Sequence, residues 1–319
     1  MSRRTLGLVA IRFKPDKKSK LSAVTDVDGA DMLHLFHGLV TNLDADKLVH
    51  HAKGRYTKIE SIVASGRSVL VKTESGPFGE VGQTIDVNTH QVSHVRGDNE
   101  SATTMTRTFF MVPPGSEVAL FVVERQGSAT GGTQLIDLFK GAMLSTYPDH
   151  FFPDETVVES DAWSAAAGLK SVTAVRYTLP LNIADGTTAI PIKAGVVRQT
   201  LEPGPGFSFL PRALWDGIRN LRIKSSEFLA FDGQDADETI VELVNGDQTK
   251  TYVLGKERQP SIRVVVTDEG EPSLTDIDLA RRAADEAKTY FNRMGFTWSD
   301  QWLTGQWSPT ALLVRLEPR

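Results

Sequence analysis

The chain has 319 residues, a hydrophobic content of 40%, a mean hydropathy of -0.20 and a formal net charge of -5 at pH 7. It lacks the roughly 18 consecutive apolar residues of a membrane helix, and charged residues interrupt its short apolar start, which argues against a signal peptide. Cysteine is absent, which excludes disulfides, thiolate catalysis and cysteine-ligated zinc, so we expect a cytoplasmic protein without membrane insertion.

The first half of the chain is expected to begin with a strand over residues 5–13. Residues 31–40 and 45–52 carry apolar side chains at helical spacing. Between residues 56 and 116, short apolar runs alternate with glycine and polar turns, which is typical of strands. These expected strands are 61–64, 68–73, 82–87, 91–95 and 104–112. The pattern predicts a mainly antiparallel sheet with packed helices.

The amino terminus concentrates positive charge. Within residues 1–20 a single acidic residue, Asp16, accompanies seven basic ones: Arg3, Arg4, Arg12, Lys14, Lys17, Lys18 and Lys20. In a chain of negative net charge, such asymmetry indicates a surface for an anionic partner, DNA or RNA. The alternative is a solvated edge strand whose lysines discourage edge-to-edge pairing.

Residues 118–144 form an expected strand–loop–helix unit, with the strand over 118–123 and the helix over 134–144. Backbone N–H groups at a helix start can hold an anion, and the residues expected to do so are Gly127, Thr130, Gly131, Gly132 and Thr133. The loop lacks the Gly-Lys-Ser/Thr ending of a nucleotide-binding P-loop. A flexible connection whose glycines serve only the turn is the alternative.

Residues 148–155 are expected to separate two lobes, and residues 202–211 are too rich in proline and glycine for regular structure. Further strands are expected at 157–159, 171–181, 188–192, 239–244, 249–254 and 261–267, and a capped helix at 275–294.

A second basic element lies at residues 212–224, where arginines accompany an aromatic residue. Phosphate could be held by Arg212, Arg219, Arg222 and Lys224, with Trp215 stacking on a base. The alternative is a surface helix with Trp215 turned into the core. The two interpretations are compatible on opposite faces of one helix.

Other chemistry finds less support in the sequence. The pairs His34/His37 and His90/His94 do not form a convincing metal site, and there is no nucleophile elbow. Acidic residues crowd 232–247, where Asp235, Asp237 and Glu242 could serve a metal-dependent nuclease, but the pattern favours a solvated acidic loop. We therefore expect no catalytic residue, no metal and no cofactor.

The segments Phe121-Val-Val-Glu-Arg-Gln-Gly127 and Thr133-Gln-Leu-Ile-Asp-Leu-Phe139 resemble a strand–loop–helix layout of phage-exclusion and phage-defence proteins of the RexA and KwaB type. The similarity covers about 40 residues, 104–144. It implies an intracellular, homodimeric, DNA-associated protein in bacterial immunity or prophage exclusion.

Together these features predict an α+β protein of two lobes, residues 1–150 and 151–319, with mainly antiparallel sheets and packed helices. The predicted function is non-catalytic association with nucleic acid, as a sensor or effector in anti-phage defence. A protein–protein interaction module and a metal-dependent nuclease stay open as alternatives.

Overall fold

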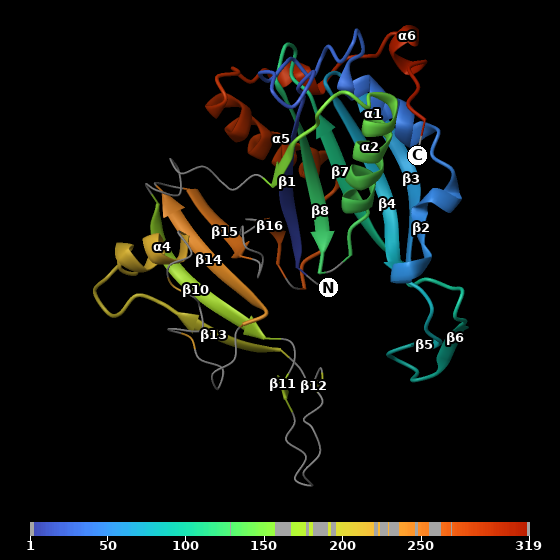
Figure 1. Cartoon of the computed structure of the whole chain (residues 1–319). Coiled ribbons are helices and arrows are strands. Elements are labelled where there is room, and N and C mark those ends of the chain that lie inside the picture. Colours follow the sequence, from blue (N-terminus) through green and yellow to red (C-terminus); the bar gives the residue numbers. More distant parts are fainter. Residues whose placement is uncertain are drawn as a thin grey trace. The chain divides into compact units, whose positions relative to one another are not determined.

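The structure, a computed structural model, describes residues 3–127, 129–156, 167–176, 179–180, 191–192, 196–219, 223, 229, 236–245, 248–254, 263–268 and 270–317. The chain forms two compact units: unit 1 consists of residues 1–156 and 266–319, and unit 2 of residues 157–265. Antiparallel strands and helices make up both (Figure 1), which confirms the predicted α+β class with two lobes. The predicted division assigned residues 266–319 to the second lobe, whereas in the structure they belong to unit 1.

Unit 1 is built on one antiparallel sheet with the strand order β1-β8-β7-β4-β3-β2, in which β9 also pairs with β1. Its strands are β1 (Arg4–Arg12), β2 (Val49–His50), β3 (Arg55–Ser65), β4 (Ser68–Pro77), β7 (Thr104–Met111), β8 (Val118–Gln126) and β9 (Asp154–Thr156). A separate hairpin of β5 (Gly82–Ile85) and β6 (Val92–Arg96) is inserted between β4 and β7.

Helices α1 (Met32–Thr41) and α2 (Gly132–Thr146) pack on one face of this sheet. Because side chains alternate along a strand, this face receives Phe110 of β7 and Phe121 of β8, whose ring centroids lie 4.2 Å apart. Phe36 of α1 and Phe139 of α2 pack on them. The four rings form the centre of the unit 1 core.

Helix α5 (Asp276–Arg293) contacts β7 and β8 from the opposite face, and its N-cap Thr275 accepts a hydrogen bond from the amide of Asp278, as the sequence predicts. Two side chains of that face form a buried ion pair, Arg107 Nε to Glu124 Oε2 at 2.8 Å. Arg107 also donates to the carbonyl oxygen of Leu274 and to Asp276. This guanidinium therefore ties the start of α5 to the sheet.

One predicted element is replaced. Residues 45–52 form no α-helix but a short helix η1 (Ala45–Leu48), strand β2 and a second short helix η2 (His51–Lys53). Pairing of Val49 with Tyr56 and of His50 with Arg55 outweighs the local helical pattern.

Residues near the end of the chain contribute to the hydrophobic core of unit 1. After η4 (Asp300–Leu303) and α6 (Pro309–Leu312), Leu316 is 2% exposed and belongs to the cluster around α1 and α2. Gly38 of α1 allows this approach, because a Cβ there would meet the backbone of Val314 and Arg315.

Unit 2 contains an antiparallel sheet in the order β13-β10-β14-β15-β16. Its elements are β10 (Gly168–Arg176), β11 (Leu179–Pro180), β12 (Pro191–Ile192), β13 (Val197–Leu201), α4 (Arg212–Arg219), β14 (Glu238–Asn245), β15 (Gln248–Leu254) and β16 (Arg263–Thr267), whose last two residues belong to unit 1. The predicted strand at 157–159 lies outside the described residues. Among the described residues of the whole chain, none belongs to a helix long and apolar enough to cross a membrane.

Candidate nucleic-acid interface

The amino-terminal basic residues are divided between the two ends of β1. Arg4 and Arg12 begin and end this strand, so their Cα atoms lie roughly 27 Å apart. Arg3 forms an ion pair with Asp268 at 3.3 Å, and Arg4 forms one with the buried Glu124 at 2.9 Å. These two cations are matched within the protein, unlike the exposed lysines at the other end.

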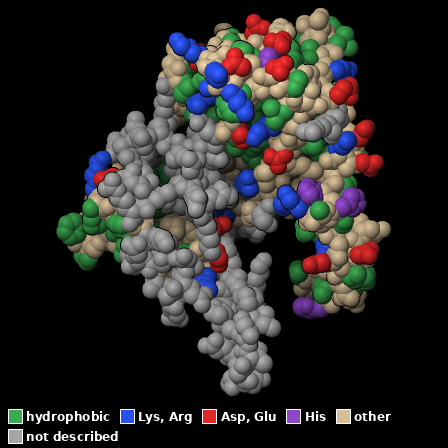
Figure 2. All heavy atoms as spheres, in the orientation of Figure 1, with side chains coloured by type: hydrophobic (Ala, Val, Ile, Leu, Met, Phe, Trp, Pro, Cys, Tyr) green, Lys and Arg blue, Asp and Glu red, His purple; other side chains and the backbone are tan. Residues whose placement is uncertain are grey.

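The exposed part of the cluster is the loop after β1. Lys17, Lys18 and Lys20 are exposed there, whereas Arg12 and Lys14 are half-buried. The carboxylate of Asp16 accepts hydrogen bonds from the hydroxyl and amide of Ser19 and from the amide of Lys18, and these bonds lower the pKa of Asp16. On the face shown in Figure 2, Lys and Arg side chains of unit 1 are interspersed with Asp and Glu side chains, so the basic surface is local.

The predicted anion-binding loop is shorter than expected, because β8 continues to Gln126 and α2 begins at Gly132. The amide of Gly131 donates to Thr106 Oγ1 and the amide of Gly132 to Thr130 Oγ1, both at 3.2 Å. Thr130, Gly131 and Gly132 are buried. These two amides are therefore engaged inside the protein.

The glycines of this loop serve the packing of α2 on the sheet. A Cβ on Gly131 would overlap the side chain of Thr73, and one on Gly132 would lie 2.5 Å from Thr108 Oγ1. Gly127 (φ +58°) and Thr133 are exposed, and Thr133 Oγ1 accepts a hydrogen bond from Arg125. Anion binding by this loop stays a prediction, centred on Thr133.

The second basic element forms helix α4 of unit 2. Trp215 is 1% exposed and packs in the unit 2 core, so the predicted core role of this ring is confirmed and it is not available for stacking on a base. Arg212 is exposed and lies 3.9 Å from Asp216. Arg219 ends the helix, but the structure does not describe its side chain, and Arg222 and Lys224 lie outside the described residues.

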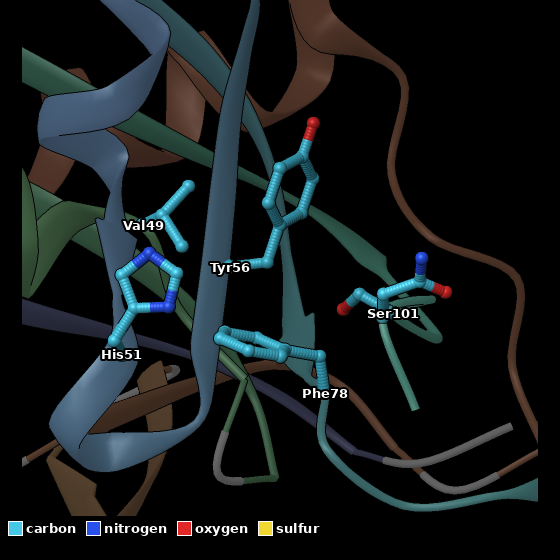
Figure 3. A pocket seen from close by; sticks show the side chains of 6 residues that line it. Val49, His51, Tyr56, Phe78 and Ser101 are labelled. Carbon is cyan, nitrogen blue, oxygen red and sulfur yellow. The ribbon is translucent and has the colours of Figure 1, made fainter. Parts of the chain in front are cut away.

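A pocket that the sequence analysis missed lies in unit 1, where β2, β3 and the chain flanking the β5–β6 hairpin meet. Its cavity volume is about 430 Å³, and its lining residues are Val49, His51, Tyr56, Phe78, Asn99 and Ser101. Figure 3 shows Val49 and His51 on one side of this aromatic pocket and Ser101 on the other, with Tyr56 and Phe78 between them. The rings of His51 and Phe78 meet edge to face, with centroids 5.8 Å apart.

Backbone geometry holds the pocket walls in place. The amide of Phe78 donates to the carbonyl oxygen of Gly54 at 2.9 Å. Gly54 has φ +55°, and a Cβ there would lie 2.9 Å from Phe78 O, so this close turn favours glycine. Across the pocket, the hydroxyl of Ser101 donates to the carbonyl oxygen of Pro77 at 3.0 Å. The pocket therefore combines the rings of His51, Tyr56 and Phe78 with the side-chain amide of Asn99 and the hydroxyl of Ser101.

Basic residues flank the aromatic pocket in the chain. The segment His50-His51-Ala-Lys-Gly-Arg-Tyr56 contains two histidines, a lysine and an arginine, and both His50 and Lys53 are exposed. Figure 2 shows His side chains beside Lys and Arg side chains in this region of unit 1. This short basic and aromatic segment was the sequence signal for the pocket, and a helical interpretation of residues 45–52 concealed it.

The remaining candidates are held in local contacts. Glu242 pairs with Lys170 at 3.0 Å, and Asp235 lies outside the described residues. His34 and His37 both contact the ring of Trp307, and burial lowers the pKa of each. Across the described ranges, no group of three or more potential ligands could hold a metal ion.

Comparison of the chain with models of protein families, with curated proteins and with solved structures finds no match.

Proposed function

We propose that the protein is a non-catalytic nucleic-acid-associated protein that holds an unpaired base in the aromatic pocket. The observation that carries this proposal is the grouping of His51, Tyr56 and Phe78 around a cavity of about 430 Å³, beside the exposed side chains of His50 and Lys53. In this proposal the protein serves as a sensor or effector in anti-phage defence, a role supported by the resemblance of residues 104–144.

The chemistry of the pocket matches a nucleobase. Stacking of a base on an aromatic side chain contributes about 1–3 kcal/mol and tolerates any sequence. Asn99 offers amide donors and an acceptor at the rim, and Ser101 offers acceptor lone pairs. Lys53 supplies a positive charge for the adjoining phosphate. Because a base within a duplex is stacked and paired, we propose a single-stranded ligand.

Phosphate contacts would give this binding a strong dependence on salt. Lys53 beside the pocket, with Lys17, Lys18 and Lys20 at the opposite end of the sheet and one further cation, would make about five contacts to one long single strand. For five contacts we expect a log–log slope of about -3.5 with single strands. A slope near zero would contradict electrostatic binding.

The direct test is a titration of the purified full chain against labelled single-stranded and duplex DNA and RNA, followed by fluorescence anisotropy at low salt. We expect single strands to bind, and Phe78→Ala to weaken binding by about 5- to 150-fold because a stacking ring is lost. The matched control is Phe207→Ala, which removes a phenylalanine that is 75% exposed and outside the pocket. Absence of binding at low salt, or equal losses in both variants, would overturn the proposal.

A protein–protein interaction module is the second candidate, and the β5–β6 hairpin favours it, because large aliphatic side chains are exposed there. Capture of a protein partner that persists after nuclease treatment, together with no binding of nucleic acid, would favour this candidate.

A further inference from the structure

The β5–β6 hairpin, residues 79–98 and hereafter the arm, projects from the rest of unit 1 as an isolated two-stranded sheet (Figure 1). Hydrogen bonds close its two ends. The amide of Gly79 donates to the carbonyl oxygen of Asp98 at its base, and the amide of Asp86 donates to that of Gln91 near its tip. Isolated two-stranded hairpins are marginally stable in water, and they gain stability when one face packs against another surface.

The arm has one apolar and one polar face. In its register Gln83 pairs with Val95 and Ile85 with Val92, and a register shift between Thr84 and Ile85 brings Val92 opposite Ile85. Alternation along β5 places Val81 on the same face as Gln83 and Ile85. The apolar side chains are exposed to 73% at Val81, 51% at Ile85, 49% at Val92 and 58% at Val95.

The opposite face of the arm is polar: Thr84 and His94 are exposed there, and Gly82 and Arg96 are half-buried. Gly82, Thr84, His94 and Arg96 pair across this face. The guanidinium of Arg96 lies over Gly82, where a Cβ would be 3.0 Å from Nη2. Binary patterning of this kind specifies a strand pair whose apolar face is buried, yet the described part of the chain leaves that face exposed.

The size and charge of the arm indicate what covers it. Its exposed aliphatic side chains, with Val87 at 80%, present on the order of 500 Å², as large as the largest apolar patches on typical monomers. Within the arm they are accompanied by the acidic residues Glu80, Asp86 and Asp98 and one basic residue, Arg96. This negative balance disfavours a phosphate backbone on the apolar face and favours a protein as the occupant.

We propose that two copies of the chain associate through their arms, apolar face on apolar face, about a two-fold axis. A standard interface buries about 800 Å² on each partner, and an aliphatic centre of roughly 500 Å² with a polar rim provides an area of that size. In an isologous contact the same surface of each subunit packs on that of the other, so the apolar faces of both arms are buried together. Val and Ile pack well against each other across strands.

The first test is the oligomeric state of the full chain, measured by sedimentation equilibrium after nuclease treatment. We expect twice the chain mass of 35.0 kDa. In a variant combining Val81→Thr, Ile85→Thr, Val92→Thr and Val95→Thr, which keeps β-branched side chains, the dimer dissociation constant should rise at least about 100-fold. Val63→Thr, at a site on β3 that is 52% exposed, should leave it unchanged.

A second test uses the absence of cysteine. In Gln83→Cys the only thiol lies on the apolar face, whereas in Thr84→Cys it lies on the polar face. A short bis-maleimide should link two copies of the first variant and not of the second. A chain that stays monomeric at about 100 µM, or equal cross-linking of both variants, would overturn the proposal and assign the face to a different protein.

Discussion

Glu124 forms a buried ion pair that its neighbours in the sequence do not predict. It follows an apolar run and precedes a glycine-containing segment, so the sequence predicts the first residue of a loop. In the structure β8 continues through it, and its carboxylate is fully buried between Arg4 and Arg107. Burial opposes the charge of Arg107, but hydrogen bonds and attraction from Glu124 and Asp276 outweigh it and raise the pKa of Arg107.

At the same scale, His37 makes the stability of unit 1 depend on pH. It is 8% exposed, and burial, with added repulsion from Arg315 and His34, lowers its pKa. The unfolded chain therefore binds more protons than the folded one once the pH falls below about 6.5. The contribution of His37 to the free energy of unfolding is fully present above that pH and is lost as the pH falls through the lowered pKa of the folded state.

We accordingly expect the free energy of unfolding in urea to be smaller at about pH 5.5 than at pH 7.5. His37→Gln should reduce this difference, because glutamine does not titrate. The acidic groups with lowered pKa, such as Asp16 and Asp86, titrate below this window. An undiminished pH difference in His37→Gln would contradict the prediction.

At the scale of elements, some glycines of α2 and its N-cap are required by close packing on the sheet, whereas another only lowers the helix propensity. A Cβ on Gly131 or Gly132 would enter the sheet, whereas one on Gly141 of the same helix meets nothing within 4 Å. We expect Gly131→Ala to destabilise the protein by about 1–3 kcal/mol through overpacking, and Gly141→Ala to stabilise it by about 0.5–1 kcal/mol. Urea unfolding measures both; equal effects would show that the close approach at Gly131 carries no cost.

Elements with strong local patterns were predictable. The hairpin of β14 and β15, the capped helix α5 and most strands of unit 1 lie near their expected residues. The segment around β2 was not, because pairing of Val49 with Tyr56 overrides a helical pattern. The aromatic pocket was missed for the same reason: its walls come from residues 49–56, 78 and 99–101, which only the fold brings together.

At the scale of the whole molecule, a residue near the end of the chain belongs to the hydrophobic core of unit 1, which is built mainly from the first half of the chain. Leu316 packs there at 2% exposure, whereas Leu313 is 68% exposed. Leu316→Ala should therefore lower the free energy of unfolding by about 2–5 kcal/mol, and Leu313→Ala should change it little. A calorimetric scan resolving the transition of unit 1 checks both; similar small effects would contradict a core role for Leu316.

This arrangement has a consequence for synthesis. Unit 2, residues 157–265, leaves the ribosome before the segment that fills the core beneath α1. Domains generally fold as units during translation, so the second unit in the chain can fold first, while the first must wait for Leu316. A nascent chain stalled before residue 307 would leave exposed the part of the core that Trp307, Val314 and Leu316 cover.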